Sequence, residues 1–531
     1  MPAPRCSTVL CIAALRSTSV PRLFVLALLI VVSGSAQASP GELDPGFAED
    51  GKVVTSFAAR DARAYAVAIQ PDGRIVVAGA ADSGDAGDFA LARYGATGRL
   101  DRSFGSSGTV TTSLGNGYDA AASVALQPDG RIVAAGLSFD ARTARYGFAL
   151  VRYNPNGSLD QSFGSGGKVT TSFEGGVARA HAVLVQPDGK IVAAGMMAPI
   201  GTFDSSFALV RYNADGSVDK SFGFGGRVVT GFGERSSFVT GLALQPDGRI
   251  VAAGSRFESG GFTGAFYGFA LARYESDGSL DRSFGVGGAV TTRIGSGGSA
   301  AAIALQPDGR IVVAGSTIGA FSDVGMPESD FALARYLPEG SLDPSFGSGG
   351  RLTTELDSDA RADAVAVGHD GRIVVAGTRT DRRFSFAVAR YAAQGSLDPS
   401  FGHRGVMETR FGGNHDEASS VAVQRNGKVV VAGSSYDAKA EHMAFALARY
   451  LDEQAICRVP KVTGRALPSG RRSLARAHCC TGRISRAFSA SVGPGRVISQ
   501  RPHPGARRVL GARVNLVVSR GARNRTSAAP R

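Results

Sequence analysis

The sequence predicts an all-β fold in which one four-stranded unit is repeated seven times, and three observations indicate this. Near-copies of the stretch "VALQPDGRIVAAG" (residues 124–136) recur along the chain. Glycine is abundant, at 72 of 531 residues, while charged residues make up only 19% and tryptophan is absent. No amphipathic helix pattern occurs within the repeats. Abundant glycine with ordinary hydrophobicity favours strands and turns over disorder or a helical bundle.

The spacing of the repeated Gln-x-Asp-Gly turn defines the period. Successive copies lie 57, 59, 59, 61, 62 and 56 residues apart. The turns begin at Gln70, Gln127, Gln186, Gln245, Gln306, Gly368 and Gln424. Regular self-similarity at this length is typical of a solenoid, an array or a propeller.

Each unit contains four strand-like runs. In the second unit these are residues 122–127, 131–136, 147–154 and 168–173, all short and bounded by turn residues. The Pro-Asp-Gly turn suits a tight hairpin. Alanine alternates with larger aliphatic residues, so both faces of the sheet are apolar, as a sheet packed between two neighbours requires. We therefore predict a seven-bladed β-propeller, with an array of β-sandwiches as the alternative.

The two ends of the repeat region each carry an incomplete unit. A lone fourth strand (residues 52–57) precedes the first hairpin, and a lone third strand (residues 444–450) ends the last unit. The N-terminal strand can supply the outer strand that the last blade lacks. We expect it to close the ring and leave no exposed edge.

An arginine after the third strand and an aspartate before Ser-Phe-Gly recur in every unit. A catalytic centre would not need seven copies, so we predict a buried or half-buried structural pair, in which the guanidinium serves carboxylate and backbone oxygens together. Exposed, unpaired charges are the alternative. The positions are Arg93, Arg152, Arg211, Arg273, Arg335, Arg390 and Arg449, with Asp44, Asp101, Asp160, Asp219, Asp281, Asp343 and Asp398.

The sequence offers few residues for catalysis. Seven histidines are scattered singly, and no nucleophile elbow, phosphate-binding loop or Cys-x-x-Cys pair occurs. The turn at residues 213–219 has oxygen ligands like those of a calcium loop, but its counterparts at 337–343 and 392–398 lose them, so we favour a structural turn. We expect no cofactor and no metal ion.

The channel mouth is where a propeller enzyme would place its site, and a hydrolase or lyase there is the alternative to a non-enzymatic binding protein. The expected inner strands carry no acid. Candidates in the loops that enter them are His181, Asp363, His415, Asp416 and Glu417. They come from different blades and match no metal-ligand spacing.

The loops between the second and third strands vary in length, while the Gln-x-Asp-Gly turns are constant. By strand alternation these loops share one rim, and such loops commonly carry recognition. Aromatic residues in the two longest loops, 255–268 and 316–330, could anchor a protein or glycan partner. They are Phe257, Phe262, Phe266, Tyr267 and Phe321. The alternative is that they fold back over the blade edges.

The first residues are typical of a secretory signal peptide, residues 1–38. Arg16 and Arg22 precede ten apolar residues (23–32), and Ala36-Gln37-Ala38 forms a cleavage site. Ten apolar residues are too few to span a bilayer; an uncleaved anchor is the alternative. No later run approaches membrane length, so we expect no transmembrane segment in the mature chain and a secreted, cell-surface or wall-associated protein.

The recurring motifs resemble a known family. "DxSFGxxG", "VTT", "VALQPDGRIVVAG" and "FALARY" recur over about residues 41–450 and are similar to the delta-60 repeats, a family of secreted or surface β-propellers. The resemblance implies a propeller over residues 39–454 and no established activity. The hairpin also resembles that of WD-repeat propellers, although the Trp-Asp signature is absent.

Charge is divided unevenly along the chain. Residues 455–531 contain 17 Arg or Lys and no Asp or Glu. Removing these and the three arginines of the leader from 58 basic residues leaves 38 basic against 45 acidic residues, so the middle carries about −7. This break predicts a domain boundary near Gln454.

The basic segment resembles a PASTA domain, a small α+β module of bacterial cell-wall receptors, over residues 456–521. "CRVPKVTGRAL", "GRVISQRPHPGARR" and "GARVNLVVSRG" carry the resemblance, with a helix expected at 469–480 and a basic disordered tail at 522–531. It implies contact with peptidoglycan, and excess arginine favours anionic wall polymers; the alternative is that arginine only aids solubility. We do not expect nucleic acid as the partner of an exported protein.

Cysteines of the mature chain occur only in this segment. Within the PASTA-like arrangement, Cys457 at the first strand and Cys479 at the helix end are well placed for a disulfide. An oxidising exterior permits such a bond. It would add about 2–4 kcal/mol to a domain with a small core.

Overall fold

The computed structural model describes residues 39–522, except 49, 59–60, 83–85, 116, 141, 203, 234–235, 260–264, 319–328, 438–440, 453–455, 478 and 510–511. Two compact units divide the chain, one of them Gly41–Asp452 and the other containing Glu453–Arg531. The expected signal peptide, residues 1–38, lies outside the described residues. Within them, no helix has the length and apolar character needed to cross a membrane.

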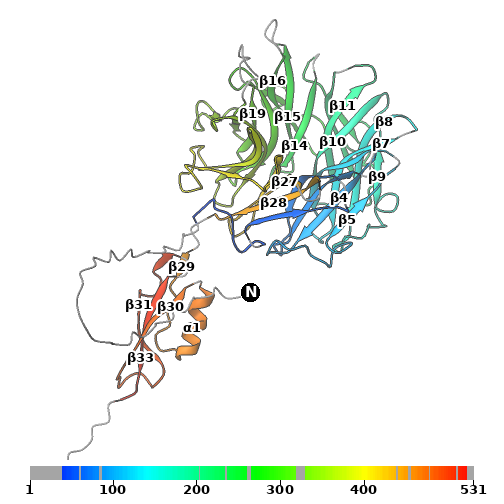
Figure 1. Ribbon diagram of the computed structural model, residues 1–531. Helices are drawn as coiled ribbons and strands as arrows, with labels where there is room; N and C mark the ends of the chain where they lie inside the picture. Colours follow the sequence, from blue (N-terminus) through cyan, green and yellow to red (C-terminus); the bar gives the residue numbers. More distant parts are fainter. Residues whose placement is uncertain are drawn as a thin grey trace, which may run out of the picture. The chain divides into compact units, whose positions relative to one another are not determined.

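The first unit is a series of four-stranded antiparallel sheets (Figure 1). In the first sheet the order is β2 (Ala62–Ile69), β3 (Ile75–Asp82), β4 (Gly87–Tyr94) and β5 (Thr109–Thr112). The same order recurs in five further sheets, made of β6 (Asp119–Leu126), β7 (Ile132–Asp140), β8 (Arg145–Tyr153) and β9 (Lys168–Thr171); β10 (Gly176–Val185), β11 (Ile191–Pro199), β12 (Ser206–Tyr212) and β13 (Arg227–Thr230); β14 (Ser237–Leu244), β15 (Ile250–Ser259), β16 (Ala265–Tyr274) and β17 (Ala289–Thr292); β18 (Gly298–Leu305), β19 (Ile311–Thr317), β20 (Phe331–Tyr336) and β21 (Arg351–Thr354); and β22 (Asp359–Val367), β23 (Ile373–Asp381), β24 (Arg383–Tyr391) and β25 (Val406–Thr409).

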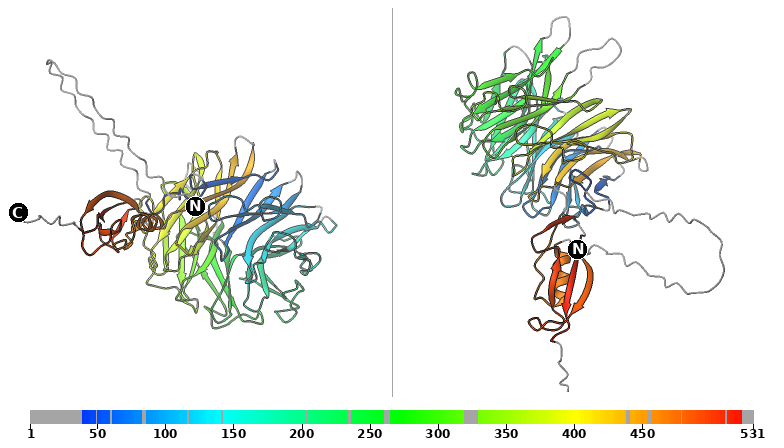
Figure 2. Two further views of the ribbon diagram at one scale, coloured as in Figure 1. Left: turned by 90° about the horizontal axis from the view of Figure 1, so that it is seen from below. Right: turned by 90° about the vertical axis from the view of Figure 1, so that its left-hand side faces the viewer.

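The seventh sheet takes strands from both ends of the unit. Its order is β1 (Lys52–Thr55), β28 (His442–Tyr450), β27 (Val429–Asp437) and β26 (Asp416–Val423). β1 pairs antiparallel with β28, and in Figure 2 the blue first strand lies beside the orange strands of this sheet. β2 of the first sheet contacts β26, and the Val67 N–H donates to Ser420 Oγ at 3.1 Å between them. The first and the last repeat are therefore neighbours.

Both faces of the sheets are buried, as the alternation of alanine with larger aliphatic residues predicts. β3 and β4 are buried along nearly their whole length. One core cluster combines Val77 and Ala92 of the first sheet with Val430 and Leu447 of the last. The prediction of an all-β fold of repeated, propeller-like four-stranded sheets is confirmed.

The strands are longer than predicted at the end that carries the variable loops. In the second repeat, β6 begins at Asp119 rather than at residue 122, and β7 continues to Asp140 rather than to residue 136. Glycine, proline and aspartate mark the constant turn clearly in the sequence. At the other end pairing continues through polar residues such as Asp140 and Arg145, which face each other across the ladder.

The recurring arginine and aspartate lie side by side in every sheet. In the third sheet, Arg211 Nε lies 2.8 Å from Asp219 Oδ2, and the two side chains are 6% and 9% exposed. The guanidinium also donates to the Ser276 carbonyl of the next sheet and packs 4.5 Å from the Phe222 ring centre. The other pairs are Arg93–Asp101, Arg152–Asp160, Arg273–Asp281, Arg335–Asp343, Arg390–Asp398 and Arg449–Asp44.

The second unit is a small α+β domain. β30 (Cys480–Ala487) runs parallel to β33 (Arg513–Ser519), which pairs antiparallel with β31 (Val497–Arg501). β29 (Ile456–Arg458) pairs with β32 (Arg507–Val509), and α1 spans Leu467–Arg476. The core consists of Val459, Val462, Leu474, Cys479, Val497, Ala506, Val514 and Leu516.

The helix of this unit differs from the predicted range of 469–480. It begins earlier because Pro468 suits the first helical turn. It ends at Arg476, and Cys480 already begins β30. Leu474 is its buried anchor.

Candidate ligand-binding cavity

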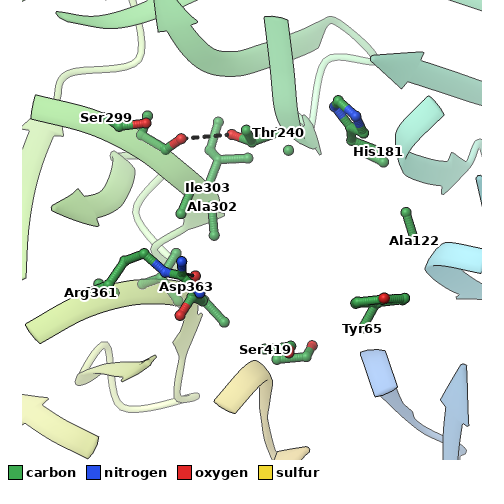
Figure 3. Close-up of a pocket in the computed structure, with 18 of the residues that line it drawn as sticks. Tyr65, Ala122, His181, Thr240, Ser299, Ala302, Ile303, Arg361, Asp363 and Ser419 are labelled. Atoms are coloured by element: carbon green, nitrogen blue, oxygen red, sulfur yellow. Dashed lines mark hydrogen bonds and ion pairs between the residues drawn. The ribbon is translucent and has the colours of Figure 1, made fainter. Parts of the chain in front are cut away.

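A cavity of about 810 Å³ lies among the first strands of the sheets (Figure 3). Its wall contains residues of all seven first strands, β2, β6, β10, β14, β18, β22 and β26. These strands also contact one another in sequence, and β26 contacts β2. They are therefore the inner strands of the unit.

Every inner strand has a β-bulge at the same place. In β10, Ala180 pairs with Gly195 and Ala182 with Ala194, so His181 has no partner in the ladder. A bulge of this kind re-aims a side chain and often adjoins a functional site. The seven extra residues all line the cavity; they are Tyr65, Ala122, His181, Thr240, Ala301, Asp363 and Ser419.

The glycine that ends each "IVAAG" run makes room for the bulge. A Cβ atom on Gly195 would lie 1.9 Å from the Arg179 carbonyl oxygen. The same close approach recurs at Gly79, Gly136, Gly254, Gly315, Gly377 and Gly433. Glycine inside a strand often marks a bulge, so this was the sequence signal that could have located the cavity-lining residues.

Gly195→Ala is expected to lower the free energy of unfolding by about 1–3 kcal/mol, because the added methyl group clashes with backbone that cannot yield. Denaturant unfolding of the full chain measures it. Gly95→Ala is the matched control, since its Cβ would meet only the Arg99 oxygen at 3.8 Å. Equal stability of the two variants would show that the bulge has room for a side chain.

One wall of the cavity is charged. Arg361 Nε donates to Asp363 Oδ1 at 2.9 Å, and Asp363 Oδ2 is buried without a hydrogen-bond partner in the described part of the chain. Burial raises the pKa of Asp363 to about 7; the Arg361 charge opposes this and the Glu417 charge adds to it. Glu417 Oε1 lies 3.0 Å from His415 Nε2, and Glu417 Oε2 lies 3.9 Å from Arg63 Nη1.

Aromatic side chains form another part of the wall and connect it with the rim. The Phe238 ring is perpendicular to His181, with centres 6.5 Å apart, and approaches Tyr267 at 6.3 Å. Tyr267 in turn contacts Phe257 edge to face at 5.6 Å. His181 Nδ1 lies 2.8 Å from the Val239 carbonyl oxygen, which requires the proton on Nδ1 and leaves Nε2 as an acceptor. Burial lowers the pKa of His181, so the ring is neutral at pH 7.

The five channel-mouth candidates occupy different positions in the structure. His181, Asp363 and Glu417 line the cavity, and His415 contacts Glu417. Asp416 is buried and accepts hydrogen bonds from the Phe411 N–H and from Ser435 Oγ. The first of these bonds holds the loop that precedes β26. The expectation that the inner strands carry no acid is wrong, because these strands begin earlier than predicted and Asp363 and Glu417 lie within them.

The rim candidates are only partly described. Phe257 and Tyr267 are half-buried and pack on each other. Phe262 and Phe321 lie outside the described residues, as does the side chain of Phe266. The described pair therefore belongs to the cluster that reaches the cavity through Phe238.

The turn with oxygen ligands at residues 213–219 is closed by its own hydrogen bonds. Asp215 Oδ1 accepts from the N–H and the hydroxyl of Ser217, and Asn213 Nδ2 donates to Ser217 Oγ. Across the residues that the structure describes, no three His, Cys, Asp or Glu side chains are grouped so as to hold a metal ion.

Repeated four-stranded sheets whose inner strands surround one cavity define a propeller-like repeat protein. The family model "Domain of unknown function (DUF5122) beta-propeller" matches residues 70–104, 127–163, 186–222, 245–284, 306–346 and 369–401, which supports a β-propeller repeat family. No curated protein matches the chain.

Similar solved structures include two lyases and the protein Sqt1. They include a catalytically inactive virginiamycin B lyase from Staphylococcus aureus with quinupristin (10% identity, TM-score 0.42, covering 75% of this chain and 98% of that one). Polysaccharide lyase Uly1 has 11% identity and a TM-score of 0.44, covering 75% and 91%. Sqt1 from Chaetomium thermophilum has 13% identity and a TM-score of 0.39, covering 72% and 82%. These similarities are too distant to assign an activity.

Proposed function

We propose that this chain is a secreted or cell-surface, non-enzymatic binding protein that takes its ligand in the cavity and the adjoining rim. The ring of bulge residues is the observation that supports it. The arginine and aspartate that join the sheets are the same in all seven repeats, whereas the bulge positions hold Tyr, Ala, His, Thr, Ala, Asp and Ser. The fold does not require these side chains, and variable positions on a rigid scaffold commonly carry recognition.

A thermal-shift screen against fractionated polymers and small molecules of the cell surface tests this function. We expect the melting temperature of the full chain to rise with at least one fraction, because a ligand that binds only the folded state stabilises it. Ala301→Trp fills the cavity from the fifth sheet and should abolish the shift. A shift that persists in this variant, or no shift with any fraction, would contradict cavity binding.

We infer further that the repeats form a closed seven-bladed propeller of the delta-60 type over residues 39–454. The pairing of β1 with β28 supports it. So does Arg449, which contacts Asp44 near the N-terminus and donates to the Ala96 carbonyl of the first sheet at 2.6 Å.

For the second unit we propose a PASTA-like domain, residues 456–521, that binds peptidoglycan or an anionic wall polymer. The helix and three-stranded sheet support this, together with the exposed side chains of Arg471 and Arg472 on α1 and of Arg483 on β30. We also propose a Cys457–Cys479 disulfide: Cys479 is buried in the core, whereas the Cys457 side chain lies outside the described residues.

The wall-binding proposal predicts that Arg471→Glu/Arg472→Glu/Arg483→Glu loses most of its co-sedimentation with purified cell wall at low salt, because exposed charges attract an anionic polymer by screened electrostatics. The control reverses three exposed arginines of the first unit, Arg102, Arg282 and Arg425. Equal sedimentation of all three proteins would rule out wall binding through the second unit.

A hydrolase or lyase that uses the cavity is the second candidate. Asp363, with a pKa of about 7, and neutral His181 line the same cavity, and such a pair can act as general acid and base near neutral pH. Turnover of a bound ligand, seen as new reducing ends or a new double bond, would favour it over simple binding.

A further inference from the structure

We propose that one end of the second unit docks on an anionic lipid surface, with the Phe488 side chain inserted among the lipid headgroups. This contact uses neither the cavity nor Arg471, Arg472 and Arg483, so it goes beyond the functions proposed above.

Phe488 lies at the end of the sheet where the termini of three strands meet. β30 and β33 run parallel and therefore both end there, and β31, which is antiparallel to β33, begins there. The tip loop, residues 488–496, joins β30 to β31. Phe488 is its first residue and follows directly on the last residue of β30.

Hydrogen bonds fix the tip loop to the end of β33 and to the chain that follows it. The Ser489 N–H donates to the Gly521 carbonyl at 2.9 Å. The Gly495 N–H donates to the Ser519 carbonyl at 2.9 Å, and Ser519 Oγ donates to the Val492 carbonyl at 2.6 Å. A loop that is already ordered loses little conformational entropy when it binds.

Phe488 presents an aromatic ring to the outside of the unit. Its exposed fraction is 51%, and in the described part of the second unit no other large apolar side chain is exposed to that degree. Ala487, Ala490 and Pro494 beside it are exposed as well. Exposed apolar surface with a charged rim marks an interaction site, so the character of the rim decides the partner.

Arginines form the rim of the tip loop. Arg486 precedes the loop, Arg496 is its last residue and Arg520 follows β33, and all three are exposed. The Arg520 guanidinium lies 5.7 Å from the Phe488 ring centre, and Arg496 donates to the Gly464 carbonyl, which leaves its charge unneutralised. Residues 455–531 contain no Asp or Glu. The chain after Gly521 continues from this end with three more arginines, Arg523, Arg525 and Arg531.

An exposed ring inside a rim of arginines fits a lipid interface better than a soluble polyanion. A soluble polyanion such as a wall polymer is attracted by charge alone and gives the ring no apolar surroundings. A membrane interface offers anionic headgroups next to an apolar layer, and aromatic side chains favour that depth. Each arginine close to an anionic membrane strengthens binding about fivefold, and the gain fades as salt screens the charges.

Co-sedimentation of the full chain with lipid vesicles tests the contribution of the ring. The vesicles consist of equal parts of phosphatidylglycerol and phosphatidylcholine, or of phosphatidylcholine alone. We expect binding to the anionic vesicles to be at least about tenfold tighter. Phe488→Ser should weaken it about tenfold, because the inserted ring is lost. Phe224→Ser is the matched control, since it removes a ring of the first unit that is 94% exposed, and it should bind as the wild type does.

The same assay tests the arginine rim. Arg486→Gln/Arg520→Gln should weaken binding to the anionic vesicles by about tenfold or more. Arg102→Gln/Arg282→Gln removes two exposed arginines of the first unit and is the charge-matched control. Equal binding of these two double variants would contradict docking through the tip loop.

A tryptophan reporter separates insertion from attraction at a distance. The chain contains no tryptophan, so the emission of Phe488→Trp reports on the tip loop alone, and this variant keeps an aromatic ring in place. The emission should shift to shorter wavelength with the anionic vesicles and stay unchanged with soluble polyphosphate, because only the vesicle removes the ring from water. Phe224→Trp should show no shift with either probe.

Three further outcomes would overturn the inference. Wild-type affinity of Phe488→Ser for the anionic vesicles would show that the ring takes no part. An unshifted emission of Phe488→Trp bound to these vesicles would reveal a surface for soluble polyanions, as in wall binding. Equal affinity for both kinds of vesicle would remove the role of the lipid charge.

Discussion

Replacing Asp219 with alanine is expected to lower the free energy of unfolding by about 3–5 kcal/mol, since it leaves the buried charge of Arg211 without its partner. Burial alone would raise the pKa of Asp219, but hydrogen bonds from Ser221 and Lys190 and the Arg211 charge outweigh it and lower the pKa. The carboxylate is thus more stable in the folded chain. Denaturant unfolding of the full chain, followed by a signal from the β-rich unit, measures the loss.

Asp215→Ala is the matched control for this variant. Asp215 lies in the same turn, is exposed and accepts from the N–H and the hydroxyl of Ser217, so its loss should destabilise the chain much less than the loss of Asp219. The pH dependence supplies a second readout. Because the pKa of Asp219 is lowered on folding, its contribution is present above the unfolded value of about 3.8 and fades as the pH falls below it. Asp219→Ala should therefore lose less stability in acid than the wild type; equal stability of both aspartate variants would exclude the structural pair.

Asp363→Asn is expected to stabilise the protein at pH 8 by about 3–4 kcal/mol relative to the wild type and to have little effect at pH 4. Burial raises the pKa of Asp363 to about 7, from 3.8 when unfolded. Below 3.8 both states bind the proton. As the pH rises through 3.8 to 7, the unfolded state releases it first, so the wild type loses stability over this window.

The measurement is the difference in unfolding free energy between Asp363→Asn and wild type from pH 4 to pH 8. The groups that face Asp363 are Arg361 and Glu417, and Glu417 is in turn close to Arg63 and His415. Asp188→Asn removes an exposed turn carboxylate and serves as control. A difference that stays flat with pH would mean that the Asp363 carboxyl is solvated like an ordinary surface acid.

Short stretches of the sequence predicted some features of the structure and not others. The repeated turn and the apolar alternation predicted seven sheets of four strands, because each hairpin is defined within about ten residues. The pairing of Arg211 with Asp219, eight residues apart, was predictable for the same reason. The bulge residues were not recognised, although the glycine opposite each of them was visible as the end of "IVAAG".

The sequence by itself determined the repeat, its strand content, the basic second unit and the six arginine–aspartate pairs that are eight residues apart, since all of these arise from residues close together in the chain. Only the tertiary structure decided which side chains share the cavity. His181 and Asp363 are 182 positions apart along the chain, and they line the same cavity because each lies at the same bulge of its own inner strand. Such an arrangement depends on how seven sheets pack around one space, and no local pattern encodes that distance.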